Sequence, residues 1–213
     1  MTTPKRWRGQ TMRDRSAERR MQLLDAGEQL LGAHGSAAVG MRAVCREANL
    51  SLRYFYESFD TREELLVAVY NRVEERLMNH ITGGGSPAPL TPRDILERCA
   101  DFFEEDPRRA RILLREPLAD DTLRKHSVSR SPAFIQALIP VVGPHLPVTV
   151  GRDPAGLEVL STVLGGALVA LYLEWADGRL NVTREAVAEA AVRVVTALAG
   201  TTMPSDSGGG GQA

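Results

Sequence analysis

Residues 38–70 read AVGMRAVCREANLSLRYFYESFDTREELLVAVY, and this stretch decides the fold that we expect for the chain. It divides into a short segment over residues 41–48, a break at Asn49, and a second, aromatic segment over residues 51–59. Two short helices joined by a tight turn, with base-reaching side chains on the second, are typical of a helix-turn-helix. Short helical hairpins also occur in many all-α proteins that bind no DNA. The spacing alone therefore leaves both interpretations open.

The physical demands of a helix-turn-helix can be checked against individual residues. Its turn requires one residue with positive φ, and Asn49, at that position, is among the best tolerated non-glycine residues there. Val44 and Cys45 supply an apolar and a small side chain where the two helices cross. Phe55 and Phe59 lie four residues apart, on one helix face, and are expected to point inward. The outward face then holds Ser51, Leu52, Arg53, Tyr56 and Glu57.

Amphipathic helices are expected on both sides of this stretch. The helical pattern begins at about Ser16 and ends at His34-Gly35, a glycine stop after a final turn with histidine. Its apolar face carries Leu23, Leu24, Gly27, Leu30 and Leu31. After the stretch, Asp60 with Glu63 and Thr61 with Glu64 form overlapping capping boxes that start a longer helix.

A break in composition separates this part of the chain from the next. Residues 82–92, TGGGSPAPLTP, hold three glycines and three prolines and cannot continue a helix. Downstream helices are expected to start where an N-cap residue precedes proline, at Thr91, Asp106, Ser131 and Asp153. We therefore predict an all-α chain with these parts: a flexible basic arm (1–15), a helix-turn-helix domain (16–76, motif about 40–59), a linker (82–92), a second helical domain (91–200) and a disordered tail (201–213).

The stretch over residues 38–70 resembles the DNA-binding domain of TetR-family (tetracycline-repressor-like) transcriptional regulators. The resemblance covers about residues 16–76 and includes the aromatic-aromatic-x-x-Phe signature, the polar turn and the acidic start of helix four. It implies an N-terminal three-helix domain, linked by a longer helix four to a C-terminal effector-binding and dimerisation domain. Asn49, Tyr54 and Glu57 depart from the family's usual glycine, small hydroxyl, and basic or aromatic residues. The operator sequence therefore does not transfer from relatives.

The resemblance also implies a function. It is that of a ligand-responsive regulator, usually a repressor, that binds a palindromic operator as a homodimer and is released or modulated by a small-molecule effector. A helical-bundle enzyme is the first alternative, but the sequence has no nucleophile motif, phosphate loop or inward carboxylate cluster, so we expect neither catalysis nor a cofactor. The second alternative is an RNA or membrane interaction module, and the arm lacks the amphipathic pattern that a membrane would require.

Candidate DNA contacts follow from the residue types and from the resemblance. Arg53 suits a bidentate contact to guanine O6 and N7. Glu57 either accepts from cytosine N4 or repels phosphate and orients Arg53. Arg42 and Arg62 are placed like the family's phosphate contacts, and Tyr56 like its backbone-contacting tyrosine. The full set is Arg42, Ser51, Leu52, Arg53, Tyr56, Glu57 and Arg62, with the arm residues Lys5, Arg6, Arg8 and Arg13. The arm is alternatively a merely solvated tail.

Charge is unevenly distributed along the chain. The net charge of −1 divides into +4 over residues 1–62 and −5 over the remainder. All but two of the 26 basic residues are arginines, whose guanidinium groups suit phosphate and guanine recognition. A near-neutral total is therefore compatible with a DNA-binding end.

The second domain carries the candidate dimer and effector residues. Two apolar helical segments near the C-terminus suggest a four-helix interface with twofold symmetry, and a hairpin in a monomeric core is the alternative. The dimer candidates are Leu164, Gly165, Leu168, Leu171, Val187, Ala191, Val194 and Val195. The effector candidates are Phe103, Phe134, Tyr172 and Trp175, with Arg115 or His126 as polar partners, and each is better explained as plain core or surface than as a ligand contact.

Other classes of protein are disfavoured by composition. The first twenty residues are polar and basic, so no signal peptide is expected, and the longest uncharged helical run is too short to span a bilayer. Cys45 and Cys99 form no paired motif, and the four histidines have no ligand spacing, so neither a disulfide nor a metal site is predicted. A cytoplasmic location is expected.

Overall fold

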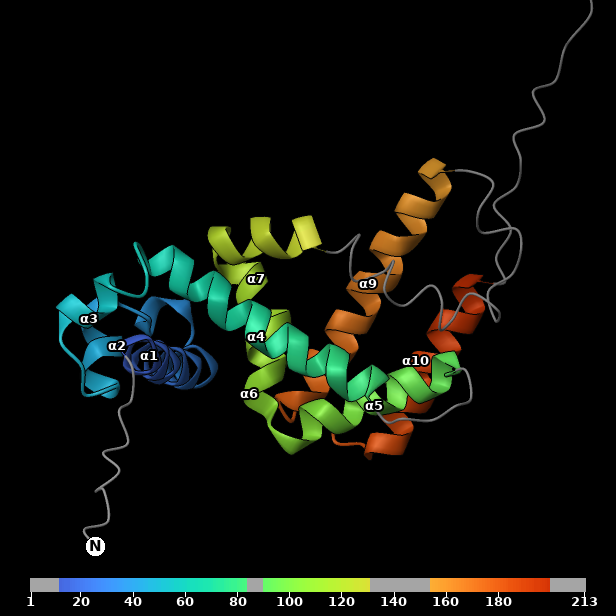
Figure 1. The fold of residues 1–213 in the computed structure, drawn as a ribbon. Helices are drawn as coiled ribbons and strands as arrows, with labels where there is room; N and C mark the ends of the chain where they lie inside the picture. Colours follow the sequence, from blue (N-terminus) through green and yellow to red (C-terminus); the bar gives the residue numbers. More distant parts are fainter. Residues whose placement is uncertain (1–11, 84–89, 131–153, 200–213) are drawn as a thin grey trace, which may run out of the picture. The chain divides into compact units, whose positions relative to one another are not determined.

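The computed structural model describes residues 12–83, 90–130 and 154–199 (Figure 1). Within these ranges every regular element is a helix and no strand occurs, which confirms the predicted all-α fold. The chain divides into two compact units, residues 1–79 with 108–131 and residues 80–107 with 132–213. None of the helices in the described ranges is both long and apolar enough to cross a membrane.

The first unit is built from the N-terminal helices and a later segment of the chain. Its elements are α1 (Met12–His34), η1 (Ser36–Ala38), α2 (Met41–Glu47), α3 (Leu52–Tyr56), most of α4 (Arg62–Thr82), α6 (Pro107–Ala110), the π-helical turn η2 (Arg111–Arg115), α7 (Glu116–Ala119) and a helix over residues 121–130. Helices α1, α2 and α3 contact one another (Figure 1). Residues 108–131 thus pack with the N-terminal helices, although the sequence assigns them to the second domain.

Helix α1 begins earlier than its apolar pattern indicates. It starts at Met12, four residues before Ser16, so Arg13 lies in a helix and not in the expected arm. The amphipathic pattern marks only where α1 begins to contact the core, because an exposed first turn carries no apolar signal. Residues 1–11, 84–89 and 200–213, which include most of the predicted arm, linker and tail, lie outside the described part.

The core of the first unit holds α3 by two aromatic side chains. Phe55 and Phe59 are both buried, and their ring centroids lie 5.8 Å apart. They pack in a core with Leu23, Leu31, Val44, Leu65 and Leu66. This confirms that Phe55 and Phe59 point inward. A helix of five residues is not stable alone, so α3 depends on this packing for its position.

The two turns around α2 have the backbone conformations that the sequence indicates. Asn49 has φ of 52° and is the only non-glycine residue with positive φ in the described part of the chain. The amide of Leu50, just after it, donates to the Cys45 carbonyl at 2.8 Å. Gly35 ends α1 with φ of 83°. The helix-turn-helix prediction is therefore confirmed in its geometry.

Gly27 allows α4 to approach α1. A Cβ atom at Gly27 would lie 3.1 Å from Cγ2 of Val69, closer than ordinary van der Waals contact. On the same helix pair, Arg72 of α4 forms an ion pair with Asp25 of α1 at 2.6 Å. The glycine among the leucines of α1 is thus explained by a close helix contact.

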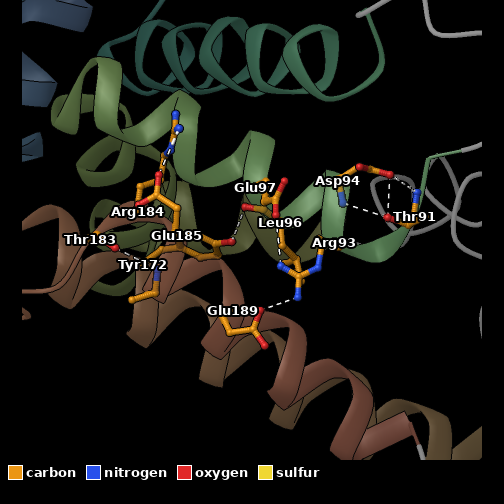
Figure 2. Close-up of polar contacts among 11 residues, drawn as sticks. Thr91, Arg93, Asp94, Leu96, Glu97, Tyr172, Thr183, Arg184, Glu185 and Glu189 are labelled. Atoms are coloured by element: carbon orange, nitrogen blue, oxygen red, sulfur yellow. Dashed lines mark hydrogen bonds and ion pairs between the residues drawn. The ribbon is translucent and has the colours of Figure 1, made fainter.

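The second unit contains α5 (Pro92–Glu105), α9 (Pro154–Ala176), α10 (Arg184–Ala199) and the last residues of α4. Helix α5 starts with a capping box, in which the Asp94 amide donates to Thr91 Oγ1 and the Thr91 amide donates to the Asp94 carboxylate (Figure 2). Two hydrogen bonds to the carboxylate, from the Thr91 hydroxyl and then from the Thr91 amide, lower the pKa of Asp94. The predicted N-cap at Thr91 is confirmed, and α10 packs against both α5 and α9.

Substitution of Phe55 tests whether α3 depends on its aromatic anchor. We expect Phe55→Ala to lower the free energy of unfolding by about 3–5 kcal/mol, because it removes a fully buried ring. Arg53→Ala, on the exposed face of the same helix, is the control and should change it by less than about 1 kcal/mol, because that side chain is 84% exposed. Urea unfolding followed by circular dichroism measures both. Equal stability of the two variants would contradict the proposed anchor.

Candidate nucleic-acid interface

The outward face of α3 carries three side chains of different chemistry. Because Phe55 points into the core, the helical period of 3.6 residues turns Arg53 and Tyr56 outward. The Arg53 side chain is 84% exposed and Tyr56 is 55% exposed. Leu52 is also exposed. The structure therefore brings a guanidinium, a phenol and an aliphatic group together on one small surface.

Two further predicted contacts lie at the starts of short helices. Ser51 is the N-cap residue of α3, with extended backbone, and its hydroxyl makes no capping hydrogen bond. Arg42 is exposed in the first turn of α2. Both side chains are open to solvent. An exposed hydroxyl or guanidinium at a helix start can donate to a phosphate oxygen.

Glu57 lies between two arginines from different helices. Arg53 Nε donates to Glu57 Oε1 at 3.1 Å, and Arg19 NH2 of α1 donates to Glu57 Oε2 at 3.4 Å. The Arg19 guanidinium also lies over the Tyr54 ring, 4.4 Å from its centroid. Sequence reasoning found Arg53 and Glu57 but missed Arg19, which is 38 residues away from Glu57.

Arg62 is engaged within the protein, whereas the resemblance places it like a phosphate contact. Its Nε donates to the Val39 carbonyl at 2.8 Å and its NH2 to the Ser36 carbonyl at 2.6 Å. Its guanidinium also lies near Glu63 and Asp120. Arg62 thus holds the turn η1 before α2 in place. A phosphate contact by Arg62 stays a prediction.

The same turn is also bound by Glu116, which sequence reasoning missed. Glu116 is only 3% exposed and accepts from the Ser36 amide at 2.7 Å and from Arg111 Nε at 3.3 Å. Arg111 NH1 also donates to the Ala33 carbonyl at the end of α1. Gly35 leaves room for the carboxylate, because a Cβ there would lie 3.0 Å from Glu116 Oε1. Nothing local in the sequence marks a contact across 80 residues.

The helix over residues 121–130 is fixed to α4 by polar contacts. His126 Nε2 lies 2.6 Å from the Asn71 side-chain oxygen, and its ring meets Tyr70 edge-on. Arg130 forms an ion pair with the buried Glu74. Burial, followed by the charge of Arg130, lowers the pKa of His126.

The polar effector partners suggested by the sequence therefore belong to the first unit. His126 has the partners just described, and Arg115 is half-buried in η2. Phe103, Tyr172 and Trp175 belong to the second unit. Phe134 lies outside the described residues, as do Lys5, Arg6 and Arg8 and the side chain of Arg13.

Two of the aromatic effector candidates pack together in the second unit. The Phe103 and Tyr172 rings are buried with centroids 5.7 Å apart, and the Tyr172 hydroxyl donates to the Leu96 carbonyl at 2.8 Å (Figure 2). Burial raises the pKa of Tyr172. Trp175 Nε1 donates to the Val182 carbonyl at 3.1 Å, beyond the end of α9. These contacts account for Phe103 and Tyr172 as core residues, and Trp175 is half-buried. An effector pocket beside them stays a prediction.

The dimer candidates divide into exposed and buried groups. On α9, Gly165 and Gly166 are exposed, and Leu164, Leu168 and Leu171 are half-buried. Val163 beside them is 51% exposed. On α10, Val194 and Val195 are half-buried.

Val187 and Ala191 differ from the expectation. They are fully buried within the unit, where α10 packs on α5 and α9, so their side chains are not available to a second subunit. The apolar period of α10 indicates a buried face but not whether its partner lies in the same chain.

One group of described residues has atoms suited to a cation. A nitrogen of His80 and carboxylate oxygens of Asp101 and Glu105 lie within 4.8 Å of one another. Asp101 already accepts from Arg184 at 2.6 Å, and its other oxygen lies 3.0 Å from His80 Nε2. These contacts form an ion-pair network that ties α10 to α5, as does the pair Arg93–Glu189 (Figure 2).

Residues 23–69 match the family model described as bacterial regulatory proteins of the tetR family. The matched range covers the apolar part of α1, the helix-turn-helix and the first turns of α4. This confirms the resemblance stated from the sequence. A search of curated protein sequences gives no match.

Solved structures share the fold over most of the chain. A TetR-like transcriptional regulator from Rhodococcus sp. RHA1 is 23% identical over 87% of this chain and 98% of its own, with a TM-score of 0.61. A TetR family transcription regulator from Marinobacter aquaeolei VT8 is 20% identical over 87% and 98%, with a TM-score of 0.63. The multidrug binding protein EbrR, complexed with imidazole, is 21% identical over 89% and 97%, with a TM-score of 0.59. At these identities the likeness establishes the fold alone.

Arg62→Ala tests the internal role of this residue. We expect the substitution to lower the free energy of unfolding by about 1–3 kcal/mol, because the Ser36 and Val39 carbonyls lose a charged donor. Arg46→Ala removes an exposed arginine of α2 and should change it by less than about 0.5 kcal/mol. Urea unfolding of both variants measures these changes in the free energy of unfolding. If Arg62→Ala is as stable as Arg46→Ala, the internal contacts of Arg62 do not hold the turn.

Proposed function

We propose that this protein, which carries the N-terminal domain of the TetR family of transcriptional regulators, is a ligand-responsive repressor that binds a palindromic DNA operator as a homodimer. The observation that carries the proposal is the exposed face of α3, directly after the turn at Asn49. This face offers Arg53 and Tyr56 to a ligand while the opposite face is locked in the core. A helix presented in this way suits the major groove.

The side chains on this surface suggest separate roles. Arg53 is suited to donate two hydrogen bonds to guanine O6 and N7, and Leu52 to contact a thymine methyl group. Ser51, Tyr56 and Arg42 are suited to phosphate oxygens, which fix the register of the protein without reading sequence. Base readout is therefore assigned to α3, and positioning to the residues around it.

Charge supports the same assignment. Residues 1–62 hold eleven basic and seven acidic side chains, whereas the remainder of the chain carries a net −5. A positive end is attracted to the phosphate backbone, so association should weaken steeply as salt rises. The arm residues Lys5, Arg6, Arg8 and Arg13 would add to this attraction.

A homodimer is supported by the apolar surface of α9. Val163, Gly165 and Gly166 are exposed on a helix that is almost entirely apolar. The two glycines would let a second helix approach closely. With Leu164, Leu168 and Leu171, and with Val194 and Val195 of α10, they form the surface that we assign to the twofold interface. A twofold dimer presents two α3 helices to two half-sites.

Response to a small molecule is proposed from the shared fold. EbrR, with the same fold, is described as a multidrug binding protein and has been solved with imidazole and with ethidium. We assign effector binding to the second domain, with Phe103, Phe134, Tyr172 and Trp175 as candidates. If the effector lowers DNA affinity, DNA must lower effector affinity by the same factor.

Two arginine variants separate base reading from phosphate contact. Arg53→Ala should abolish a preference of about tenfold at one base pair of each half-site. Arg42→Ala should weaken binding to every sequence and reduce the slope of log affinity against log salt by about one per subunit. Fluorescence anisotropy with duplexes selected from a random pool measures both. The interface is wrongly assigned if both variants bind every duplex like the wild type.

Val163→Arg tests the dimer surface. A twofold interface would bury the new charge twice, so we expect the dimer dissociation constant to rise by at least about tenfold. Val182→Arg is the control, since Val182 is similarly exposed but lies between α9 and α10. Sedimentation equilibrium reports the dissociation constants. A dimer unaffected by Val163→Arg would place the interface elsewhere.

A further inference from the structure

The two oxygens of Glu57 are each bound by a different arginine. Oε1 accepts from Arg53 Nε of α3 and Oε2 accepts from Arg19 NH2 of α1. Arg19 is itself fixed by stacking on Tyr54, with its guanidinium 4.4 Å from the ring centroid. A chain of contacts therefore runs from the long helix α1 through Glu57 to Arg53. We call it the Arg19–Glu57–Arg53 chain.

The atom that Arg53 uses in this chain determines what it can offer to a ligand. A guanidinium has five N–H groups in one plane, and here the Nε–H points back to Glu57. The two terminal NH2 groups have no partner among the described residues, and the side chain is largely exposed. Their fork can donate two parallel hydrogen bonds, which matches the O6 and N7 acceptors of guanine.

The charges in the chain also favour this arrangement. One carboxylate lies between two guanidinium groups, so the group of three carries a net positive charge. The negative charge of Glu57 is thereby shielded from a nearby phosphate backbone. Because each of its oxygens already accepts from an arginine, a contact from Glu57 to cytosine N4 would have to share an oxygen with Arg53 or Arg19. Of the two roles that the sequence leaves open, the geometry favours the orientation of Arg53.

We propose that Glu57 and Arg19 are positioning residues for DNA readout, which hold Arg53 so that its terminal fork reads a guanine in each half-site. Arg19 contributes from α1. The proposal rests on the proposed function, since it specifies the base that α3 recognises. Holding Arg53 in advance reduces the side-chain entropy that is lost on binding.

The test compares two substitutions that remove the same charge. Glu57→Ala breaks the chain, whereas Glu47→Ala removes an exposed carboxylate at the end of α2 and leaves the chain intact. The probe is a duplex selected from a random pool by the wild-type protein, with each guanine replaced in turn by 7-deazaguanine, which lacks N7. Fluorescence anisotropy at one salt concentration gives the dissociation constant for each 7-deazaguanine duplex and for the unmodified duplex, and the ratio of the two is compared between variants.

We expect the wild type and Glu47→Ala to lose about tenfold in affinity at one guanine per half-site. For Glu57→Ala, the loss of affinity caused by 7-deazaguanine should fall to about twofold or less. Arg19→Gln should also reduce this loss. Glu57→Gln keeps an acceptor for Arg53 but lacks the charge that pairs with Arg19, so an intermediate loss is expected. In a protein that already carries Arg53→Ala, adding Glu57→Ala should not change the ratio of dissociation constants further, because Glu57 acts through Arg53. Thermal unfolding by circular dichroism identifies any variant that is not folded.

Two results would overturn the inference while leaving DNA binding intact. The first is an unchanged ratio for Glu57→Ala and Glu57→Gln. The second is a ratio that Glu57→Ala still alters in the Arg53→Ala background, which would mean that Glu57 acts independently of Arg53. A wild-type protein that selects no sequence would instead refute the proposed function, and this inference with it.

Discussion

The packing of Phe55 and Phe59 into the core is the constraint on which the rest of the first unit depends. Helix α3 is only five residues long, so its own hydrogen bonds cannot hold it in place. The buried ring of Phe55 within α3 and that of Phe59 just after it fix both its position and its rotation. Once that rotation is fixed, helical geometry decides that Arg53 and Tyr56 face outward. The core and the candidate DNA surface are therefore two consequences of one packing arrangement.

The polar contacts of the first unit fix the parts that this packing does not reach. The turn η1 between α1 and α2 consists of a serine and two alanines, and two charged side chains from elsewhere in the chain hold it. Glu116 accepts from the Ser36 amide, while Arg62 donates to the Ser36 and Val39 carbonyls. The buried Glu116 carboxylate and the partly buried Arg62 guanidinium thus both bind the same short backbone segment. Through Glu116 and Arg111, the segment that follows α5 in sequence helps to hold the helix-turn-helix.

Local patterns were enough to predict the all-α fold, the positive φ of Asn49, the capping at Thr91 and the inward rings of α3. Each depends on residues within a few positions of one another, where backbone geometry leaves few options. Contacts between distant residues were not predictable in the same way. Arg19 with Glu57 and Ser36 with Glu116 are separated by 38 and 80 residues, and nothing in either local sequence requires the partner. The burial of Val187 within its own unit was missed for a related reason, because an apolar face does not reveal which surface covers it.

The central claim is that the exposed face of α3 enters the major groove of an operator with two half-sites. Dimethyl sulfate tests this most directly, because it methylates guanine N7 in the major groove and adenine N3 in the minor groove. On a duplex selected by the wild-type protein, we predict protection of guanine N7 at two symmetrically placed positions, and loss of that protection with Arg53→Ala. Protection of adenine N3 alone, or a guanine pattern that Arg53→Ala leaves unchanged, would contradict the claim.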